Sequence, residues 1–116
     1  MEVKAKFDII YMADAIDFLD SLPEKAKDKI AFNISKSRYF IDKELFKKLN
    51  ENIWEFRTRH QNVTYRLLAF WDNDIGSLVV ATHGFIKKTQ KTPLNELSRA
   101  ETLRKKYFID KNNKNN

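Results

Sequence analysis

Five basic or titratable side chains fall on three consecutive segments that are rich in aromatic and β-branched residues: Arg57, Arg66, His83, Lys87 and Lys88. Short segments of this kind, separated by polar and turn-prone residues, are typical of antiparallel strands, so the sequence predicts a three-strand meander. Neighbouring strands of a meander can bring their side chains together over one surface of the sheet. We therefore take these five residues as the candidate catalytic group.

The chemistry that this group could perform is cleavage of a phosphodiester. Arginine binds phosphate oxygens in pairs, and lysine contributes a point charge. Transesterification of RNA needs a proton acceptor for the 2′-hydroxyl, a proton donor for the leaving oxygen, and positive charge around the pentavalent phosphate. His83 can carry a proton near neutral pH, and the pKa of a crowded lysine or arginine can fall far enough to help. No metal ion and no cofactor is predicted.

Each residue also has an ordinary structural interpretation. A strand arginine can be solvated, or it can pair across the sheet with Glu55 or Asp72, and His83 can simply pack at the end of a strand. A cluster favours the functional interpretation, because like charges on one surface repel unless an anion neutralises them. Two further cations, Arg59 in the first strand and Lys91 in a lysine-rich segment before a helix, are candidates for binding RNA phosphates.

Alternation along the strands predicts one core face and one charged face. Trp54 and Phe56 share the core face, with the charged residues of that strand opposite. The same rule places His83 on the face of Ala81. Gly84 follows directly, and a glycine inside a strand indicates a bulge or a close approach of another part of the chain.

The first half of the chain predicts one strand and two helices. Residues 4–12 are apolar enough to be covered on both faces or to pair inside the sheet. From Ala13 the pattern becomes helical, with Ile16 and Leu22 on the apolar face. Residues 21–24, Ser-Leu-Pro-Glu, match a capping box for the next helix.

The second helix is expected to be about 17 residues long, with Ala26, Ile30, Ile34 and Ile41 on its buried side. Residues 46–52 follow as a polar connection into the strands. These two helices should form a hairpin that packs on the apolar face of the sheet.

The clearest helix start in the chain has Thr92 as N-cap and Pro93 as first helical residue. The core-facing stripe of this last helix would be Leu94, Leu97, Ala100, Leu103 and Tyr107. Residues 110–116 are polar and of low complexity, so we expect a disordered tail there after a single domain of residues 1–109.

Composition limits the class of protein. The chain has 116 residues, a net charge of +6 and no cysteine. This charge favours polyanionic partners, and the lack of cysteine excludes disulfides and thiolate metal sites. There is no apolar run of about 20 residues and no apolar leader, so we expect a cytoplasmic protein without membrane spans.

Four groups of residues carry a resemblance to a known family. They are Trp-Glu-Phe-Arg at 54–57, Thr-Tyr-Arg-Leu at 64–67, His-Gly-Phe-Ile-Lys-Lys-Thr at 83–89, and Thr-Pro at 92–93 with the segment 96–100. In this combination the chain resembles the RelE/ParE superfamily of type II toxins, and within it the phage-derived, HigB-like branch. The α+β, RelE-like fold of that superfamily has the order β-α-α-β-β-β-α, with a mainly antiparallel sheet packed against helices. Periodicity independently gave the same order.

The resemblance implies a toxin that cleaves mRNA, commonly on the ribosome, and so inhibits translation and growth. It implies a cognate helix-turn-helix antitoxin of the HigA type, through which alone the complex would bind operator DNA. Arg66 matches the arginine that RelE-like enzymes use on the scissile phosphate, Arg57 falls near a basic strand position, and Lys87 or Lys88 near the basic residue after the last strand's glycine. The C-terminal tyrosine of several such nucleases has no clear counterpart. A ParE-like gyrase inhibitor and a non-catalytic antitoxin-binding module are the alternatives.

Overall fold

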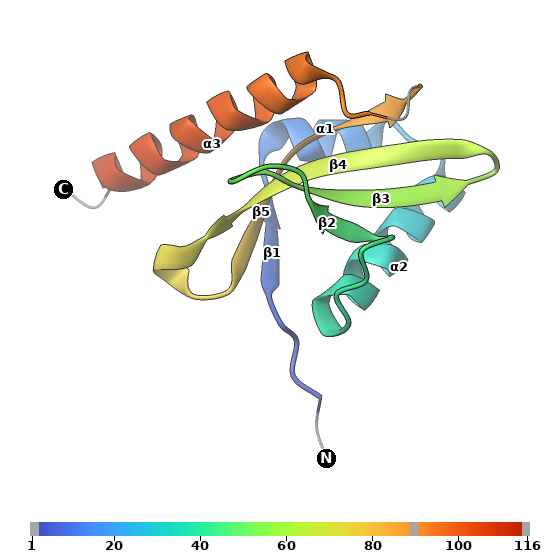
Figure 1. The fold of residues 1–116 in the computed structure, drawn as a ribbon, viewed down its shortest axis with the longest axis horizontal. Coiled ribbons are helices and arrows are strands. Elements are labelled where there is room, and N and C mark those ends of the chain that lie inside the picture. The colour runs from blue at the N-terminus through green and yellow to red at the C-terminus, as the bar shows by residue number, and fades with distance from the viewer. Residues whose placement is uncertain (1–2, 89–90, 115–116) are drawn as a thin grey trace.

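The computed structural model describes residues 3–88 and 91–114, which form a five-stranded sheet with helices on both of its faces (Figure 1). The elements are β1 (Asp8–Tyr11), α1 (Ala13–Asp20), α2 (Glu24–Tyr39), β2 (Phe46–Lys48), β3 (Trp54–His60), β4 (Val63–Asp72), a 3-10 turn (Asn73–Ile75), β5 (Leu78–Lys87) and α3 (Leu94–Lys114). The strand order is β1-β5-β4-β3-β2, and only the β1–β5 pair is parallel. The predicted α+β class and the three-strand meander are therefore confirmed, with β2 as an additional strand.

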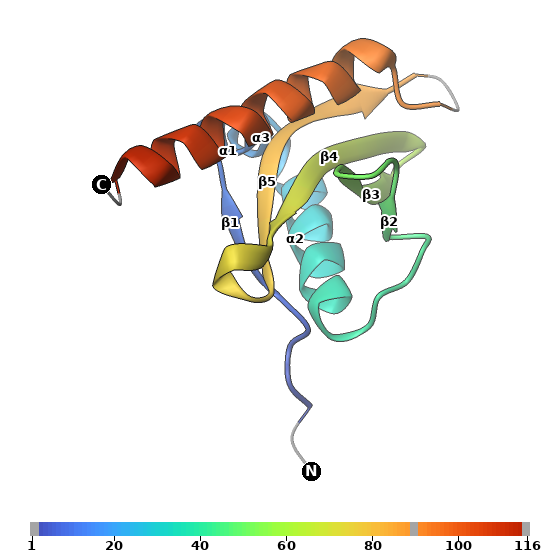
Figure 2. The ribbon, with the colours of Figure 1, turned by 60° about the vertical axis from the view of Figure 1, so that its left-hand side comes forward.

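Each face of the sheet has its own apolar core. On the first face α1 and α2 pack against Phe46, Phe56, Leu67 and their neighbours. On the second face Ala100, Leu97 and Tyr107 of α3 cover Leu68, Phe70 and Val80. Figure 2 shows α3 running along one side of the sheet, with α2 on the other. The prediction of one core face and one charged face was thus wrong in part, because α3 covers a large section of the face that carries the arginines.

An irregularity in β5 changes the direction of the candidate histidine. Leu68 pairs with His83, but the next residue, Ala69, pairs with Ala81, so Thr82 has no partner opposite it in β4. One extra residue reverses the alternation. His83 therefore lies on the α3 side of the sheet and not, as predicted, on the face of Ala81.

Gly84 is a point of close approach, as its position in a strand predicted. A Cβ atom at this residue would lie 2.2 Å from Cδ2 of Phe18. The ring of Phe18, in α1, occupies the space that any other side chain would need. The glycine therefore allows α1 to pack directly on β5.

Several predictions for the first half of the chain were wrong in detail. β1 is an edge strand, and Ile10 is 43% exposed, so its apolar residues are not covered on both faces. Within α1 the buried residue is Ala15, while Ile16 is 47% exposed. No side chain caps the start of α2, and the Ser21 hydroxyl donates to the Phe18 carbonyl instead, so the capping box does not form.

The second helix is close to its prediction, with 16 residues and with Ile30 and Ile34 buried. Ile41 lies beyond its end and is 44% exposed. The predicted polar connection contains β2, which pairs with β3 through the wholly buried Phe46. Two lysines follow Phe46, and they conceal this short strand in the sequence.

The last helix begins at Leu94, one residue later than predicted. The Thr92 hydroxyl donates to Glu55, while the Pro93 carbonyl accepts from Leu97 N. Ala100 is buried, as the predicted stripe requires, but Leu94 is 80% exposed.

The polar tail predicted for residues 110–116 was wrong over 110–114, which continue α3, and residues 115–116 lie outside the described part of the chain. The domain limits of 1–109 stay a prediction. Among the helices of the described residues, none is long and apolar enough to cross a membrane.

Candidate nucleic-acid interface

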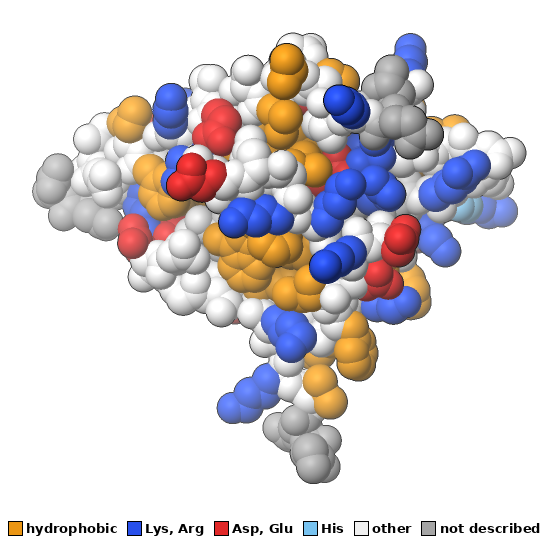
Figure 3. Space-filling model, in the orientation of Figure 1, with side chains coloured by type: hydrophobic (Ala, Val, Ile, Leu, Met, Phe, Trp, Pro, Cys, Tyr) orange, Lys and Arg blue, Asp and Glu red, His pale blue; other side chains and the backbone are white. Residues whose placement is uncertain are grey.

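An open groove of about 810 Å³ lies where β3, β4 and β5 meet α2 and the loop that follows it. Seven cationic side chains line this groove: Lys29, Lys36, Arg57, Arg59, Arg66, Lys87 and Lys88. The carboxylates among its lining residues are Asp42 and Glu44. Figure 3 shows Lys and Arg side chains gathered over the part of the surface where β3 and β4 run together. A groove with this balance of charge attracts anions.

Arg57 and Arg66 lie directly opposite each other on β3 and β4. Like charges in that arrangement repel, and a buried carboxylate compensates them. Glu55 is wholly buried and accepts a hydrogen bond from Arg66 Nη1, while its second oxygen accepts from the Thr92 hydroxyl at 2.8 Å. For Arg66 the ordinary interpretation, a cross-strand partner of Glu55, therefore holds.

Arg66 still contributes to the groove. Its side chain is only 4% exposed, yet it belongs to the groove lining, and its Nε atom has no hydrogen-bond partner among the described residues. The same is true of Nε in Arg57. Burial lowers the pKa of Arg66, Glu55 opposes this effect, and Arg57 adds to it. The two guanidinium groups thus keep donors that an anion in the groove could use.

Lys87 brings a third cation to the same place from β5, where it pairs with Thr64 of β4. Burial lowers the pKa of Lys87, and the charges of Arg66 and Arg57 lower it further, against the opposing effect of Glu55. A lysine in such surroundings is deprotonated more easily than a lysine in water. This is the behaviour that the sequence analysis expected of a crowded cation.

The remaining predicted cations divide into two groups. Arg59 and Lys88 are exposed and line the groove, as a role in RNA binding would need. Lys91 is also exposed, but it is not among the groove-lining residues. The structure therefore brings Arg59 and Lys88 to Arg57 and Lys87, and does not bring Lys91 there.

His83 lies beneath α3 and is not among the groove-lining residues. It is 1% exposed, with Nε2 at 3.3 Å from Glu96 and Nδ1 at 3.1 Å from the Thr82 hydroxyl. Burial lowers the pKa of His83, Arg99 lowers it further, and Glu96 opposes both. The catalytic role predicted for His83 finds no support in this position. Thr82, which has no partner opposite it in β4, turns the imidazole under the helix. Gly84 indicated a bulge or a close approach here, but neither the extra residue at Thr82 nor the side to which the imidazole turns.

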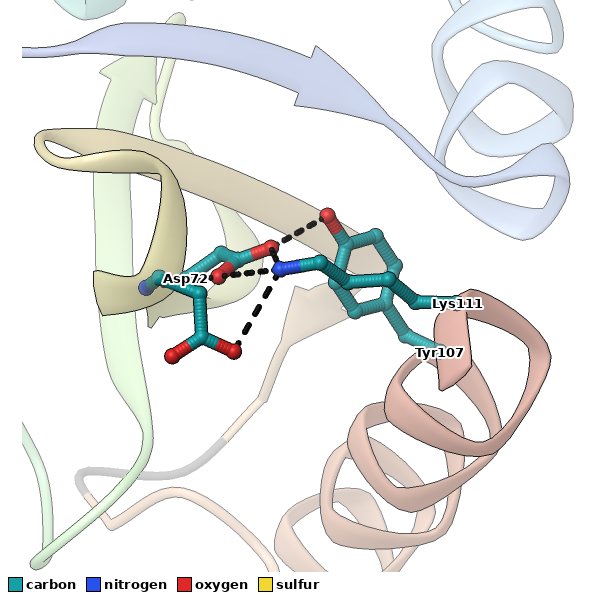
Figure 4. A network of polar contacts seen from close by, with 4 residues as sticks. Asp72, Tyr107 and Lys111 are labelled. Atoms are coloured by element: carbon teal, nitrogen blue, oxygen red, sulfur yellow. Dashed lines mark hydrogen bonds and ion pairs between the residues drawn. The ribbon is translucent and has the colours of Figure 1, made fainter. Parts of the chain in front are cut away.

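Asp72, the other predicted partner for a strand arginine, instead contacts two side chains of α3 (Figure 4). This wholly buried carboxylate accepts from the Tyr107 hydroxyl at 2.7 Å and from Lys111 Nζ at 2.9 Å. Burial raises the pKa of Asp72, but the bonds from Lys111, Tyr107 and the Asp74 amide outweigh it and the net direction is down. Burial and Asp72 raise the pKa of Tyr107 to about 12. These contacts fix the C-terminal half of α3 on the sheet.

The sequence analysis did not assign the contribution of α2 to the groove. Lys29, Phe32, Asn33 and Lys36 follow one another at helical spacing and form its wall. The signal for them was present, since the buried positions Ile30 and Ile34 fix which side of α2 faces outward. The sequence did not predict that β3 lies next to the outward side of α2.

The residues of 3–88 and 91–114 include no group of three or more His, Cys, Asp or Glu side chains that could hold a metal ion. The polar side chains that line the groove are seven cations, the two carboxylates of Asp42 and Glu44, the amide of Asn33 and the hydroxyl of Thr64. Cations, amides and hydroxyls bind phosphate and carboxylate oxygens.

Six chains among the solved structures are similar to this one, including the two that follow. One is the RelE–RelB complex of Pyrococcus horikoshii OT3, with 13% identity, a TM-score of 0.49, and coverage of 68% of this chain and 92% of that one. The other is the toxin–antitoxin complex RelBE2 of Mycobacterium tuberculosis, with 19% identity, a TM-score of 0.46, and coverage of 71% and 99%. Comparison with curated proteins found no match.

A family model, described as phage-derived protein Gp49-like, matches residues 17–105. The matched range contains the complete meander and every groove-lining cation. It confirms the phage-derived relationship that the sequence motifs indicated, and the HigB-like branch stays a prediction. The chain belongs to the Gp49-like family of phage-derived proteins.

Proposed function

We propose that this protein is the toxin of a type II toxin–antitoxin pair and that it cleaves mRNA in the cationic groove, in the course of translation on the ribosome. The observation that carries the proposal is the convergence of Arg57, Arg66 and Lys87 from three adjacent strands on one groove. Phosphate is the ligand whose charge and geometry such a group fits. Arg59 and Lys88 extend the same surface for neighbouring phosphates of the RNA.

The chemistry follows from the charges. Arg57 and Arg66 bind the oxygens of the scissile phosphate and stabilise the charge of the pentavalent state. Lys87, with its lowered pKa, accepts the proton of the 2′-hydroxyl, whose oxygen then bonds to phosphorus as the bond to the 5′-oxygen breaks. Lys88 donates a proton to that leaving oxygen. His83 takes no part, because Glu96 and α3 enclose it.

The partners in this proposal are those that the family resemblance implies. They are a cognate helix-turn-helix antitoxin of the HigA type, the ribosome and mRNA, with operator DNA bound only through the antitoxin. An acidic antitoxin segment is chemically suited to the same groove, since seven cations and two carboxylates line it. Neutralisation by occupation of the groove would follow directly.

A second candidate, a toxin or binding module without catalysis, is favoured by two observations. Arg66 already has a carboxylate partner in Glu55, and His83, the candidate proton carrier, is buried and is not among the groove-lining residues. Both features are compatible with a groove that only binds an acidic protein segment. The experiment must therefore separate cleavage from binding.

The test is inducible expression of the wild-type protein, of Arg57→Ala and Lys87→Ala, and of the control Lys105→Ala, whose lysine is exposed on α3 outside the groove. Transcript integrity and DNA supercoiling are followed together, and circular dichroism of each purified variant checks its fold. Transcript cleavage that the two groove variants lose and Lys105→Ala keeps supports the nuclease. DNA damage signalling with intact transcripts supports gyrase inhibition, and absence of any growth effect supports the binding module.

Arg66→Ala is a poor probe of activity. At a strand edge or in a loop, Arg66 could be replaced by alanine without loss of the fold. Arg66 instead lies in the central strand β4 and neutralises a buried carboxylate. Its removal leaves Glu55 charged and without its cationic partner, which destabilises the fold. Loss of toxicity in that variant would not distinguish catalysis from folding.

A further inference from the structure

The wall of the groove that α2 forms contains one exposed aromatic ring. Phe32 is 64% exposed and lines the groove together with the cations of β3, β4 and β5. Its helical neighbours at this wall are Lys29, three residues before it, and Lys36, four residues after it. An exposed phenylalanine between two lysines has no part in either core of the described protein.

The setting of α2 fixes the position of that ring. Asn33, the next residue, is buried, and its side-chain amide donates to the Thr58 hydroxyl of β3 at 3.2 Å. Ile30 and Ile34 enter the core on the same side. The helix therefore cannot rotate about its axis, and Phe32 is held at the rim of the groove beside β3.

We infer that Phe32 stacks on an unpaired base of the RNA whose phosphates the groove cations bind, so that the substrate class is single-stranded RNA. This inference rests on the proposed function. A nucleotide offers an anionic phosphate and a flat aromatic base, and the groove offers the matching pair of surfaces.

The surroundings of Phe32 favour a base over an apolar protein side chain. Seven cations line this groove, and an apolar partner would have to remove water from them without replacing those contacts. A stacked base keeps its phosphate in reach of Arg57 or Lys87 while one face of the base covers the ring. Since every base has such a face, the contact selects unpaired nucleotides with little regard to sequence.

Phe40 provides a matched control within the same protein. It directly follows α2 and is also 64% exposed, but it is not among the groove-lining residues. Any general effect of removing an exposed phenylalanine should therefore appear equally in Phe32→Leu and Phe40→Leu. An effect of base stacking should appear only in Phe32→Leu.

The experiment measures binding of an end-labelled, single-stranded oligoribonucleotide of mixed sequence to the full chain by fluorescence anisotropy. Phe32→Leu keeps apolar area but removes the ring, so it should raise the Kd roughly fivefold to 150-fold, the equivalent of one lost stacking contact. Phe32→Trp should keep wild-type affinity, because it retains a stacking surface. Phe40→Leu should not differ from wild type.

A second measurement tests the base directly. An abasic position is moved along the oligoribonucleotide, and one location should weaken binding by the wild-type protein but leave binding by Phe32→Leu unchanged. Equal affinities of wild type and Phe32→Leu for the oligoribonucleotide overturn the inference, as do equal losses in Phe32→Leu and Phe32→Trp. Binding that Lys87→Ala weakens and Phe32→Leu does not overturns the stacking role alone. Failure of the wild-type protein to bind or cleave RNA overturns the proposed function together with the inference.

Discussion

Replacement of Glu55 by glutamine should destabilise this protein far more than its single altered atom suggests. Glu55 is wholly buried, Arg66 is 4% exposed, and the carboxylate accepts bonds from Arg66 and Thr92. The amide removes the negative charge, and Arg66 and Arg57 then oppose each other across β3 and β4 without compensation. Breaking one partner of a buried ion pair typically costs about 3–5 kcal/mol.

The assay is urea unfolding followed by circular dichroism, with Glu51→Gln as the matched control, since Glu51 is an exposed glutamate of the loop before β3. Glu55→Gln should lower the urea midpoint with little change in the slope, because the surface exposed on unfolding stays the same. Glu51→Gln should change the unfolding free energy by less than about 0.5 kcal/mol. Sulfate should restore part of the stability of Glu55→Gln, because an anion in the groove replaces the missing charge.

The double variant Glu55→Gln with Arg66→Met completes the cycle. Removal of both charges leaves neither partner of the pair buried without the other, so the double variant should be more stable than Glu55→Gln alone. A loss below about 1 kcal/mol in Glu55→Gln, or a double variant that is the least stable of the set, would contradict the view that this carboxylate compensates the paired arginines.

Three further outcomes follow from the structure. Gly84→Ala places a methyl group against the ring of Phe18 and should lower the unfolding free energy by about 1–3 kcal/mol. Thermal unfolding measures this loss, and the double variant Gly84→Ala with Phe18→Leu should recover part of it. Tyr107→Phe removes a hydrogen bond to the buried carboxylate of Asp72 and should lower the unfolding free energy by about 1–3 kcal/mol. In urea unfolding the control Tyr39→Phe should lose little stability, and equal losses in the two variants would contradict the prediction. The cleavage rate should rise with pH and level off below the ordinary pKa of lysine, because the lowered pKa of Lys87 makes its neutral form available earlier, and Lys87→Arg should abolish that rise.

The buried carboxylate of Asp72 gives the fold a dependence on acid. Its pKa in the folded protein lies below the ordinary value, because the bonds from Lys111, Tyr107 and the Asp74 amide outweigh the effect of burial. A carboxyl group with a depressed pKa stabilises the fold fully above its ordinary pKa and progressively less as pH falls through the folded value. The urea midpoint should therefore fall below about pH 4, and Asp72→Asn should be unstable at neutral pH with a weaker dependence on acid.

The sequence predicted those parts of the fold that depend on local pattern. Alternation identified β3, β4 and β5, and helical spacing identified α2 with Ile30 and Ile34 on its buried side. β2 was missed because two of its three residues are lysines, and its stability comes from pairing with β3 and from the burial of Phe46. The pairing of β2 with β3 makes this segment a strand, and its local sequence propensity does not predict it.

The candidate site was predicted to the extent that strand pairing determines it. A meander necessarily brings Arg57 beside Arg66 and Lys87 near both, and it did so. The predicted face of His83 was wrong because one extra residue in β5 reverses the alternation, and neither Thr82 nor the glycine after His83 specifies the side to which the chain turns. In the fold His83 lies under α3, the element that follows β5, where Glu96 contacts its ring.

The position of Glu55 explains how such a site can exist without its ligand. Two arginines face each other across adjacent strands, and burial together with their charges lowers the pKa of a third cation, Lys87. Without Glu55 the repulsion among these three cations would oppose folding. Because Glu55 supplies a single negative charge for the three, the groove keeps a surplus of positive charge. The fold is thereby stable on its own and still attracts an anion, and the same carboxylate, through Thr92, attaches the start of α3 to the sheet. Glu55 therefore contacts both an arginine of the groove and the residue that precedes α3.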